Sequence, residues 1–247
     1  MRLSCLTVLV ALLASTSVLS GADTAAKIKL LLITGDDVKA HAWKEMSEAT
    51  LEVLNASGKF DVKAVEGLDV LNRKDELAPY AAIVFMLYNS RKVALSDEAK
   101  ANLLEYVKGG RGFVPVHLAS ASFNDWKEWN EMCGRYWVMG RSGHGPRGEF
   151  KAKIANREHP IAKGVEDFTA DDELYAKLLG DAKIDVLVEA DSDWSKKTEP
   201  LMWTLEYGQG RVFANAFGHD GKAIRNPTVA KLMVRGCEWA ATGRVTE

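Results

Sequence analysis

The run KIKLLLIT at Lys27–Thr34, closed by Gly35-Asp36-Asp37, is the stretch that decides the fold. A continuous apolar run of this length that stops at glycine and aspartate is typical of a parallel strand buried on both faces. Two further runs have the same character, YAAIVFML at Tyr80–Leu87 and GFVPVHL at Gly112–Leu118. Because amphipathic segments separate these runs, the sequence predicts an α/β fold: an open, mostly parallel sheet with helices on both faces.

The remaining elements follow from periodicity and from boundary residues. Ser96 is suited to cap a helix N-terminus, and Gly109-Gly110 to end that helix. The second half of the chain is less regular and contains a glycine-rich loop at 140–146. We predict helices at residues 38–56, 96–108, 126–137 and 227–241, and further strands at 60–66, 150–155, 185–190, 202–205 and 211–217.

The N-terminus differs in character from the rest of the chain. Arg2 precedes the apolar run Leu3–Ala14, and small residues follow, so residues 1–22 are predicted to be a secretory signal peptide. A membrane anchor is the alternative, but the apolar run is much shorter than the roughly 20 residues that cross a bilayer. We therefore expect one domain at 23–247 without a membrane span, exported to the periplasm or the extracellular space.

Composition narrows the classes of partner. Lys and Arg number 32 against 34 Asp and Glu, and no basic stripe is present, so we expect a small-molecule partner and no nucleic acid. Cys133 and Cys237 are interpreted as small buried residues rather than a disulfide, and no C-x-x-C spacing supports a cysteine metal site. The sequence does not determine the number of subunits, and a homo-oligomer is compatible with it.

Histidines gather where the predicted strands end. His117 closes one strand, His219 follows another, and His41 lies just after the first. Ligands of open α/β sheets bind at the carboxyl ends of the strands, and His144 lies in a glycine-rich loop long enough to reach that edge. Each histidine taken singly could be a structural or surface residue, but their convergence predicts a site. Imidazole suits acid–base catalysis and metal binding.

Other polar and aromatic residues are candidates for the same pocket. Asn89 follows a predicted strand, and Asp220 follows His219. Aromatic faces pack against sugar rings, although such residues are more often part of a core. We expect Trp43 or Trp203 near the pocket. No G-x-S-x-G, G-x-G-x-x-G or G-x-x-x-x-G-K-[ST] motif is present, which disfavours an α/β-hydrolase nucleophile and the corresponding NAD and ATP sites.

Six stretches of the chain, at residues 109–117, 159–164, 172–175, 203–213, 217–220 and 235–240, together resemble the ThuA-like (trehalose utilisation) family. The resemblance implies a flavodoxin-like sheet similar to that of class I glutamine amidotransferases, in which a cysteine nucleophile follows the central strand. His117 occupies that place here, so glutamine hydrolysis is not expected. In chain order the stretches are GGRGFVPVH (109–117), HPIAKG (159–164), DELY (172–175), WT with YGQGRVF (203–213), FGHD (217–220) and RGCEWA (235–240).

The resemblance also implies a function in carbohydrate metabolism, in pathways that run through 3-keto sugars. It suggests a hydrolase, lyase or isomerase whose base and acid are His117 and His219, or whose metal ligands they are if a divalent ion such as zinc is bound. Glu173 would supply a carboxylate, Tyr175 a phenol, and Asp220 would orient an imidazole. The alternative is a non-catalytic exported module that binds a sugar in the same pocket. Substrate-binding candidates are His41, Trp43, Asn89, His144, Tyr175 and Trp203.

Overall fold

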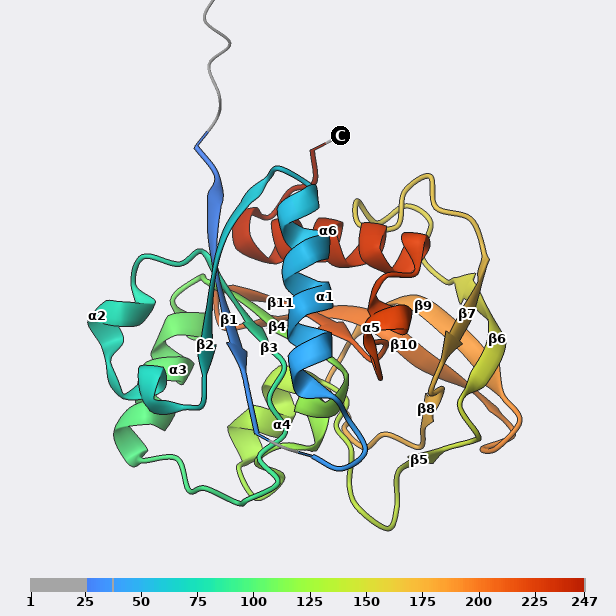
Figure 1. Cartoon of the computed structure of the whole chain (residues 1–247), viewed down its shortest axis with the longest axis horizontal. Helices are drawn as coiled ribbons and strands as arrows, with labels where there is room; N and C mark the ends of the chain where they lie inside the picture. The colour runs from blue at the N-terminus through green and yellow to red at the C-terminus, as the bar shows by residue number, and fades with distance from the viewer. Residues whose placement is uncertain (1–25, 37, 247) are drawn as a thin grey trace, which may run out of the picture.

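The structure is a computed structural model that describes residues 26–36 and 38–246. The predicted signal peptide at 1–22 lies outside these residues. The centre of the fold is a nine-stranded sheet in the order β2-β1-β3-β4-β11-β10-β9-β6-β7 (Figure 1). Its first five strands pair in parallel and its last four antiparallel. The predicted open α/β fold is confirmed, with a large antiparallel extension that the sequence did not distinguish.

The parallel half is built from continuous apolar runs. In β1, the side chains from Leu30 to Ile33 have no exposed surface. Such runs form strands because both faces of the sheet are covered, so alternate polar positions would bury unpaired groups. The five strands are β1 (Ile28–Thr34), β2 (Phe60–Glu66), β3 (Ala82–Phe85), β4 (Gly112–Pro115) and β11 (Gly210–Asn215).

Helices cover both faces of this half. The chain moves from β1 to β2 in one direction along the sheet and from β3 to β4 in the other. Right-handed crossovers therefore place α1 (Trp43–Ala56) and α3 (Asp97–Lys108) on opposite faces. Helix α6 (Pro227–Thr242) packs beside α1, and α4 (Lys127–Cys133) lies against β10 and β11 (Figure 1). The predicted Ser96 cap is confirmed, since its hydroxyl accepts from the Ala99 backbone N–H.

The antiparallel half consists of β10 (Lys197–Tyr207), β9 (Asp185–Ser192), β6 (Gly148–Ile154) and β7 (Phe168–Asp172). Strand β7 was not predicted, and β10 is longer than expected. A separate two-stranded ladder pairs β5 (Gly143–His144) with β8 (Tyr175–Ala176) inside segments expected to be loops. The short elements are a 3-10 turn at Asp69–Asn72, α2 (Lys74–Leu77), a 3-10 turn at His117–Ala121 and α5 (Gly221–Ile224).

Two boundaries differ from the prediction in ways that matter for the site. The first helix begins at Trp43 rather than at residue 38, because Asp36 accepts hydrogen bonds from Ser90 and the intervening chain forms a loop with a bridge between Val38 and His41. The strand predicted at 112–118 ends at Pro115, and His117 begins a 3-10 turn. Both histidines therefore lie in loops at the sheet edge rather than inside regular elements.

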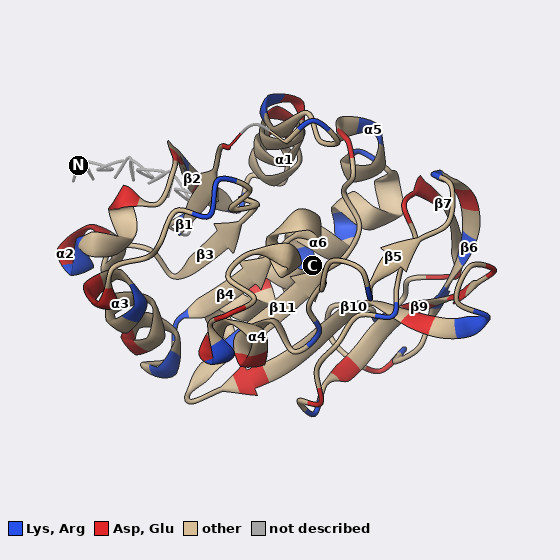
Figure 2. Ribbon diagram, turned by 90° about the horizontal axis from the view of Figure 1, so that it is seen from below, with Lys and Arg blue, Asp and Glu red and all other residues tan. Residues whose placement is uncertain are grey.

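The described surface and interior agree with the composition. Figure 2 shows Lys and Arg interspersed with Asp and Glu over both halves of the sheet. Cys133 and Cys237 are buried free thiols in helices, as predicted for small packing residues. Within residues 26–36 and 38–246, no helix combines the length and apolar character that crossing a bilayer requires.

Candidate functional site

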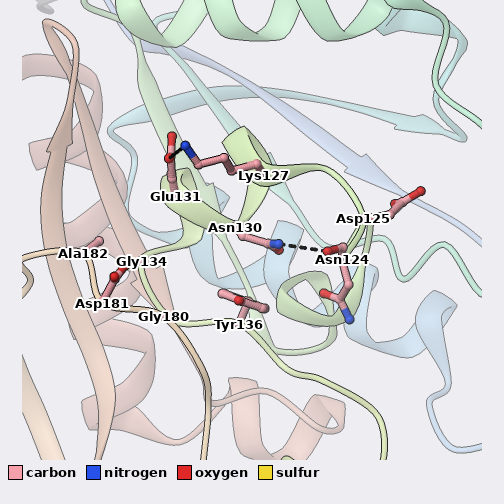
Figure 3. A pocket seen from close by; sticks show the side chains of 10 residues that line it. All are labelled: Asn124, Asp125, Lys127, Asn130, Glu131, Gly134, Tyr136, Gly180, Asp181 and Ala182. Carbon is pink, nitrogen blue, oxygen red and sulfur yellow. Dashed lines mark hydrogen bonds and ion pairs between the residues drawn. The ribbon is translucent and has the colours of Figure 1, made fainter.

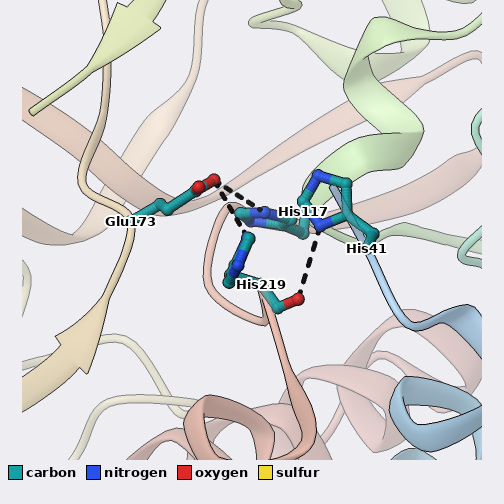
Figure 4. Close-up of side chains that lie close together, drawn as sticks. All are labelled: His41, His117, Glu173 and His219. Atoms are coloured by element: carbon teal, nitrogen blue, oxygen red, sulfur yellow. Dashed lines mark hydrogen bonds and ion pairs between the residues drawn. The ribbon is translucent and has the colours of Figure 1, made fainter. Parts of the chain in front are cut away.

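Four loops deliver one ionisable side chain each to the carboxyl edge of the sheet. His41 follows β1, His117 follows β4, and His219 follows β11, which agrees with the prediction that strand ends gather these rings. Glu173 arrives from the other half of the molecule, directly after β7. Figure 4 shows its carboxylate pointing at the rings of His117 and His219, with His41 on their far side.

The carboxylate of Glu173 is the centre of the cluster. Its Oε2 lies 3.2 Å from Nδ1 of His219 and 3.6 Å from Nε2 of His117. Its Oε1 lies 3.3 Å from Nε2 of His144. One ligand atom from each of His41, His117, Glu173 and His219 lies within 4.8 Å of the others. Among the residues that the structure describes, this is the group of histidine, cysteine and acidic side chains that could hold a metal ion.

His117 is held by its backbone conformation, by a hydrogen bond at Nδ1 and by a stacked aromatic ring. It has a φ of 46°, in the left-handed region that costs a residue with a side chain of order 1–3 kcal/mol. Its Nδ1 lies 2.7 Å from the Ala216 carbonyl oxygen, which can only accept, so Nδ1 carries the proton. The ring of Tyr175 stacks on it at a centroid distance of 4.1 Å. These contacts aim Nε2 at Glu173.

His41 completes the group of rings. Its Nδ1 lies 3.3 Å from the backbone oxygen of His219, so the same reasoning places a proton on Nδ1 and leaves Nε2 bare. Its ring meets those of His117 and His219 edge-on, at centroid distances of 5.1 and 4.7 Å. Burial, assisted by the neighbouring His117, lowers the pKa of His41 to about 4. This ring is therefore neutral at pH 7.

Glu173 and His219 form an ionic pair. Burial alone would raise the pKa of Glu173, but the imidazoles of His117 and His219 outweigh it and hold that pKa well below its ordinary value. In return, Glu173 raises the pKa of His219, against the effect of burial. The site thus holds a carboxylate that stays charged and that stabilises the cationic form of His219.

Asp172 supports the site and was missed as a functional residue. Its side chain is 1% exposed, and it accepts hydrogen bonds from the backbone N–H groups of Gly218 (2.7 Å), His219 (3.1 Å) and Glu173 (2.8 Å). Burial raises its pKa, although these donors favour the charged form. It fastens the end of β7 to the loop after β11. The sequence feature that could have identified Asp172 is its position as the first residue of the DELY stretch at 172–175.

The structure brings most of the predicted site residues together but not all of them. Asp220 does not orient an imidazole: it caps α5 by accepting from the Ala223 N–H, and its other oxygen pairs with Arg147 at 2.8 Å. Trp203 does not line the cluster: it is a core residue whose indole donates to the Cys133 carbonyl at 2.9 Å. The members found at or against the cluster are His41, His117, His144, Glu173, Tyr175 and His219.

Asn89 and Trp43 are not among the four clustered donors. The side-chain Nδ2 of Asn89 donates to the Val93 carbonyl oxygen, and its Oδ1 accepts from the Val93 backbone N–H. These two bonds close a local turn. Asn89 also lines a cavity of about 460 Å³ that includes Tyr88, Phe123 and Trp126 but none of the clustered residues. Trp43 opens α1 and is half-buried, with the ammonium of Lys44 5.4 Å from its ring centre.

A second polar cavity also lies away from the cluster. It has a volume of about 300 Å³ and is lined by α4 and the following turn, including Asn130, Glu131 and Tyr136 (Figure 3). Figure 3 shows the side chain of Asn130 donating to the backbone oxygen of Asn124, and Lys127 paired with Glu131 on the same helix. None of the described histidines or cysteines lines this cavity, so the candidate chemistry stays with the Glu173 cluster.

The comparisons with known proteins agree with this architecture. The ThuA family model, described as trehalose utilisation, matches residues 29–240. The chain belongs to the ThuA family. A ThuA-like protein from Parabacteroides merdae is 30% identical, with a TM-score of 0.77 over 90% of this chain and 92% of that one. A ThuA-like protein from Bacteroides uniformis is 17% identical, with a TM-score of 0.67 over 87% and 91%. The glutamine amidotransferase-like sheet expected from the resemblance is consistent with ThuA membership.

More distant structures share the ThuA fold alone. A β-galactosidase from Bacillus circulans is 12% identical, with a TM-score of 0.56, and the alignment covers 83% of this chain but 30% of that one. A search of curated proteins finds no match for the chain.

Proposed function

We propose that this chain is an exported enzyme that acts on a sugar-derived small molecule, with 3-keto sugars and 3-keto glycosides as the substrate class. The observation that carries the proposal is the contact of one carboxylate, Glu173, with the imidazoles of His117, His144 and His219. Imidazole and carboxylate groups are the usual agents of proton transfer near neutral pH. Membership of the trehalose-utilisation family supplies the carbohydrate context.

The proposed reaction is an elimination. A ketone at C3 of the sugar acidifies the hydrogen on C2, and a base on the protein takes this proton. The electron pair left behind forms a double bond between C1 and C2, and the bond from C1 to the glycosidic oxygen breaks. That oxygen leaves with a proton from an acid on the protein, so nothing is oxidised or reduced. The negative charge that builds on the ketone oxygen requires a cation beside it.

We assign the proton transfer to His144. The side chain of His144 is 31% exposed, against 18% for His219 and 0% for His117. A ring without exposed surface cannot meet a substrate hydrogen, so His117 serves to orient the cluster. The positive charge next to the ketone oxygen comes from His219, whose pKa is raised by the neighbouring carboxylate of Glu173.

Thiolate chemistry of the glutamine amidotransferase kind is disfavoured. His117 occupies the turn after β4 where a nucleophilic cysteine would lie. Burial raises the pKa of both Cys133 and Cys237, so neither thiol ionises readily. The sheet is therefore shared with that class, while the chemistry is different.

Export rests on the N-terminal pattern at residues 1–22. We expect the protein isolated from its source to begin near residue 23 and to fractionate outside the cytoplasm. Sequencing the N-terminus of the isolated protein tests this directly. A chain that retains Met1 and stays in the cytoplasmic fraction would contradict it.

The activity is tested with the purified chain 23–247, trehalose, 3-keto-trehalose and simpler 3-keto glucosides, with product release followed by chromatography. We expect turnover of the keto compounds alone, and a fall in kcat of about 100-fold or more in His144→Asn. His159→Asn is the matched control, because His159 lies outside the cluster, where it accepts the Ile161 N–H and packs edge-on against Trp239. Sugar binding without turnover in calorimetry would favour the non-catalytic module instead.

A further inference from the structure

We propose that His41, His117, His219 and Glu173 together bind one divalent transition-metal ion of the zinc class. The inference deepens the proposed function, because such an ion is the cation that the ketone oxygen requires, but its test does not depend on the substrate. Three imidazole nitrogens and one carboxylate oxygen form a donor set suited to zinc and its neighbours rather than to calcium or magnesium.

Unpaired buried nitrogens support the proposal. Nε2 of His117 and Nδ1 of His219 are both buried, and among the described residues neither has a hydrogen-bond partner beyond its charge contact with Glu173. Buried polar atoms are almost always partnered, so two orphans side by side need an explanation. Both lie beside the same atom, Oε2 of Glu173, at 3.6 and 3.2 Å. A cation bound between these three atoms would satisfy all of them.

The outer contacts of the rings set the tautomers that a metal needs. His117 donates from Nδ1 to the Ala216 carbonyl, and His41 donates from Nδ1 to the His219 carbonyl. Each ring therefore presents a bare Nε2 to the cluster. Metal-binding histidines commonly use their second nitrogen in this way, which fixes both the ring orientation and the tautomer. A pair of purely structural histidines would have no reason to share this arrangement.

The spacing is close to that of a metal site. Ligand atoms about 2.1 Å from a tetrahedral metal lie about 3.4 Å apart. The separations of Glu173 Oε2 from His219 (3.2 Å) and from His117 (3.6 Å) are both close to the tetrahedral value. The widest separation in the cluster is 4.8 Å, so small side-chain rotations complete the site.

The same geometry separates the metal from the proton carrier. His144 contacts Oε1 of Glu173, whereas the two orphaned nitrogens face Oε2. Glu173 therefore binds the ion through Oε2 while its second oxygen holds His144 next to the site. Glu173 thus positions His144, which stays free to exchange a proton.

The test begins with the chain 23–247 stripped by a chelator and titrated with Zn²⁺ in calorimetry, and separately with Co²⁺ in the visible spectrum. We expect one ion per chain and the absorption bands of Co²⁺ bound to nitrogen and oxygen. His41→Asn keeps a donor to the His219 carbonyl but removes the ligand, and Glu173→Gln is isosteric. Each should weaken binding about 100-fold or more, and His159→Asn should leave it unchanged. Circular dichroism establishes that each variant is folded.

Two outcomes overturn the proposal. One is the absence of stoichiometric binding by the parent chain, and the other is binding that His41→Asn and Glu173→Gln leave unchanged. Failure of the metal inference is distinct from failure of the proposed function. Full keto-sugar turnover by chelator-treated protein without bound metal would contradict the metal inference and support the proposed enzyme function. One tightly bound ion without turnover of any sugar would support the metal inference and contradict the proposed enzyme function.

Discussion

The carboxylate of Asp172, at the end of β7, accepts a hydrogen bond from the backbone N–H of His219, in the loop after β11, at 3.1 Å. The two residues belong to opposite halves of the sheet. The bond, together with that from Gly218 at 2.7 Å, places Glu173 and His219 face to face. Asp172 is thus the link through which the antiparallel half contributes to the candidate site.

Asp172→Asn tests this link. An amide in place of the carboxylate sets an N–H group against the buried N–H of Gly218, so we expect the free energy of unfolding to fall by about 1–3 kcal/mol. Urea denaturation measures the change. Asp220→Asn is the matched control, because asparagine caps a helix as well as aspartate and that side chain is partly exposed. Equal stability of the two variants would argue against the link.

The left-handed backbone of His117 gives a second prediction. His117→Ala and His117→Gly remove the same ring, but only glycine adopts a φ of 46° without strain. We expect the glycine variant to be the more stable of the two by about 1 kcal/mol, the reverse of the usual order at ordinary positions. Thermal and urea unfolding of both variants provide the comparison. A more stable alanine variant would be incompatible with this backbone.

Gly236 allows α6 to approach β11. A Cβ at this position would lie 2.1 Å from ring carbons of Phe213. Alanine normally favours a helix over glycine by about 1 kcal/mol, but here the clash should outweigh that gain. We expect Gly236→Ala to destabilise the fold by about 1–3 kcal/mol. Adding Phe213→Leu should recover part of the loss in a double-mutant cycle, and strict additivity would exclude the contact.

Glu238 predicts how stability depends on pH. Burial alone would raise its pKa, but Lys59 at 2.7 Å and the N–H and hydroxyl of Thr246 outweigh it and lower the pKa below its ordinary value of 4.5. A lowered pKa in the folded state means that the carboxylate stabilises the protein above the unfolded value. This stabilisation is lost as the pH falls through the folded value.

We therefore expect Glu238→Gln to lower the free energy of unfolding at pH 7, by about 1–3 kcal/mol from its charged hydrogen bonds. The difference from the parent chain should shrink as the pH falls below about 4.5, where the carboxyl of the unfolded chain takes up a proton, and should disappear below the lowered pKa of the folded state. Urea unfolding at pH 7, 5 and 3.5 measures this convergence. A difference that is constant over the range would show that Glu238 is not ionised in the fold.

The sequence by itself determined the parallel half of the fold and the histidines of its edge. Buried strands such as Ile28–Thr34 are continuous apolar runs, and the residue after such a run must lie at the carboxyl end of the sheet. His41, His117 and His219 follow three strands of one parallel sheet, so their convergence requires no knowledge of side-chain contacts. Motif order alone was sufficient to indicate the ThuA family, which the match at 29–240 confirms.

Only the tertiary structure decided which groups meet those rings. The antiparallel strands are partly polar and partly exposed, so β7 had no clear periodicity, and its position depends on pairing with β6 rather than on local sequence. That pairing brings Glu173 to the histidines. Asp220 was assigned to the pocket because it follows His219 in the chain, and Trp203 because aromatic rings pack against sugars. Arg147 and the Cys133 carbonyl, contributed by distant segments, engage them instead. Local pattern specifies which face a side chain takes, whereas its partner is fixed by the packing of segments far apart in the chain.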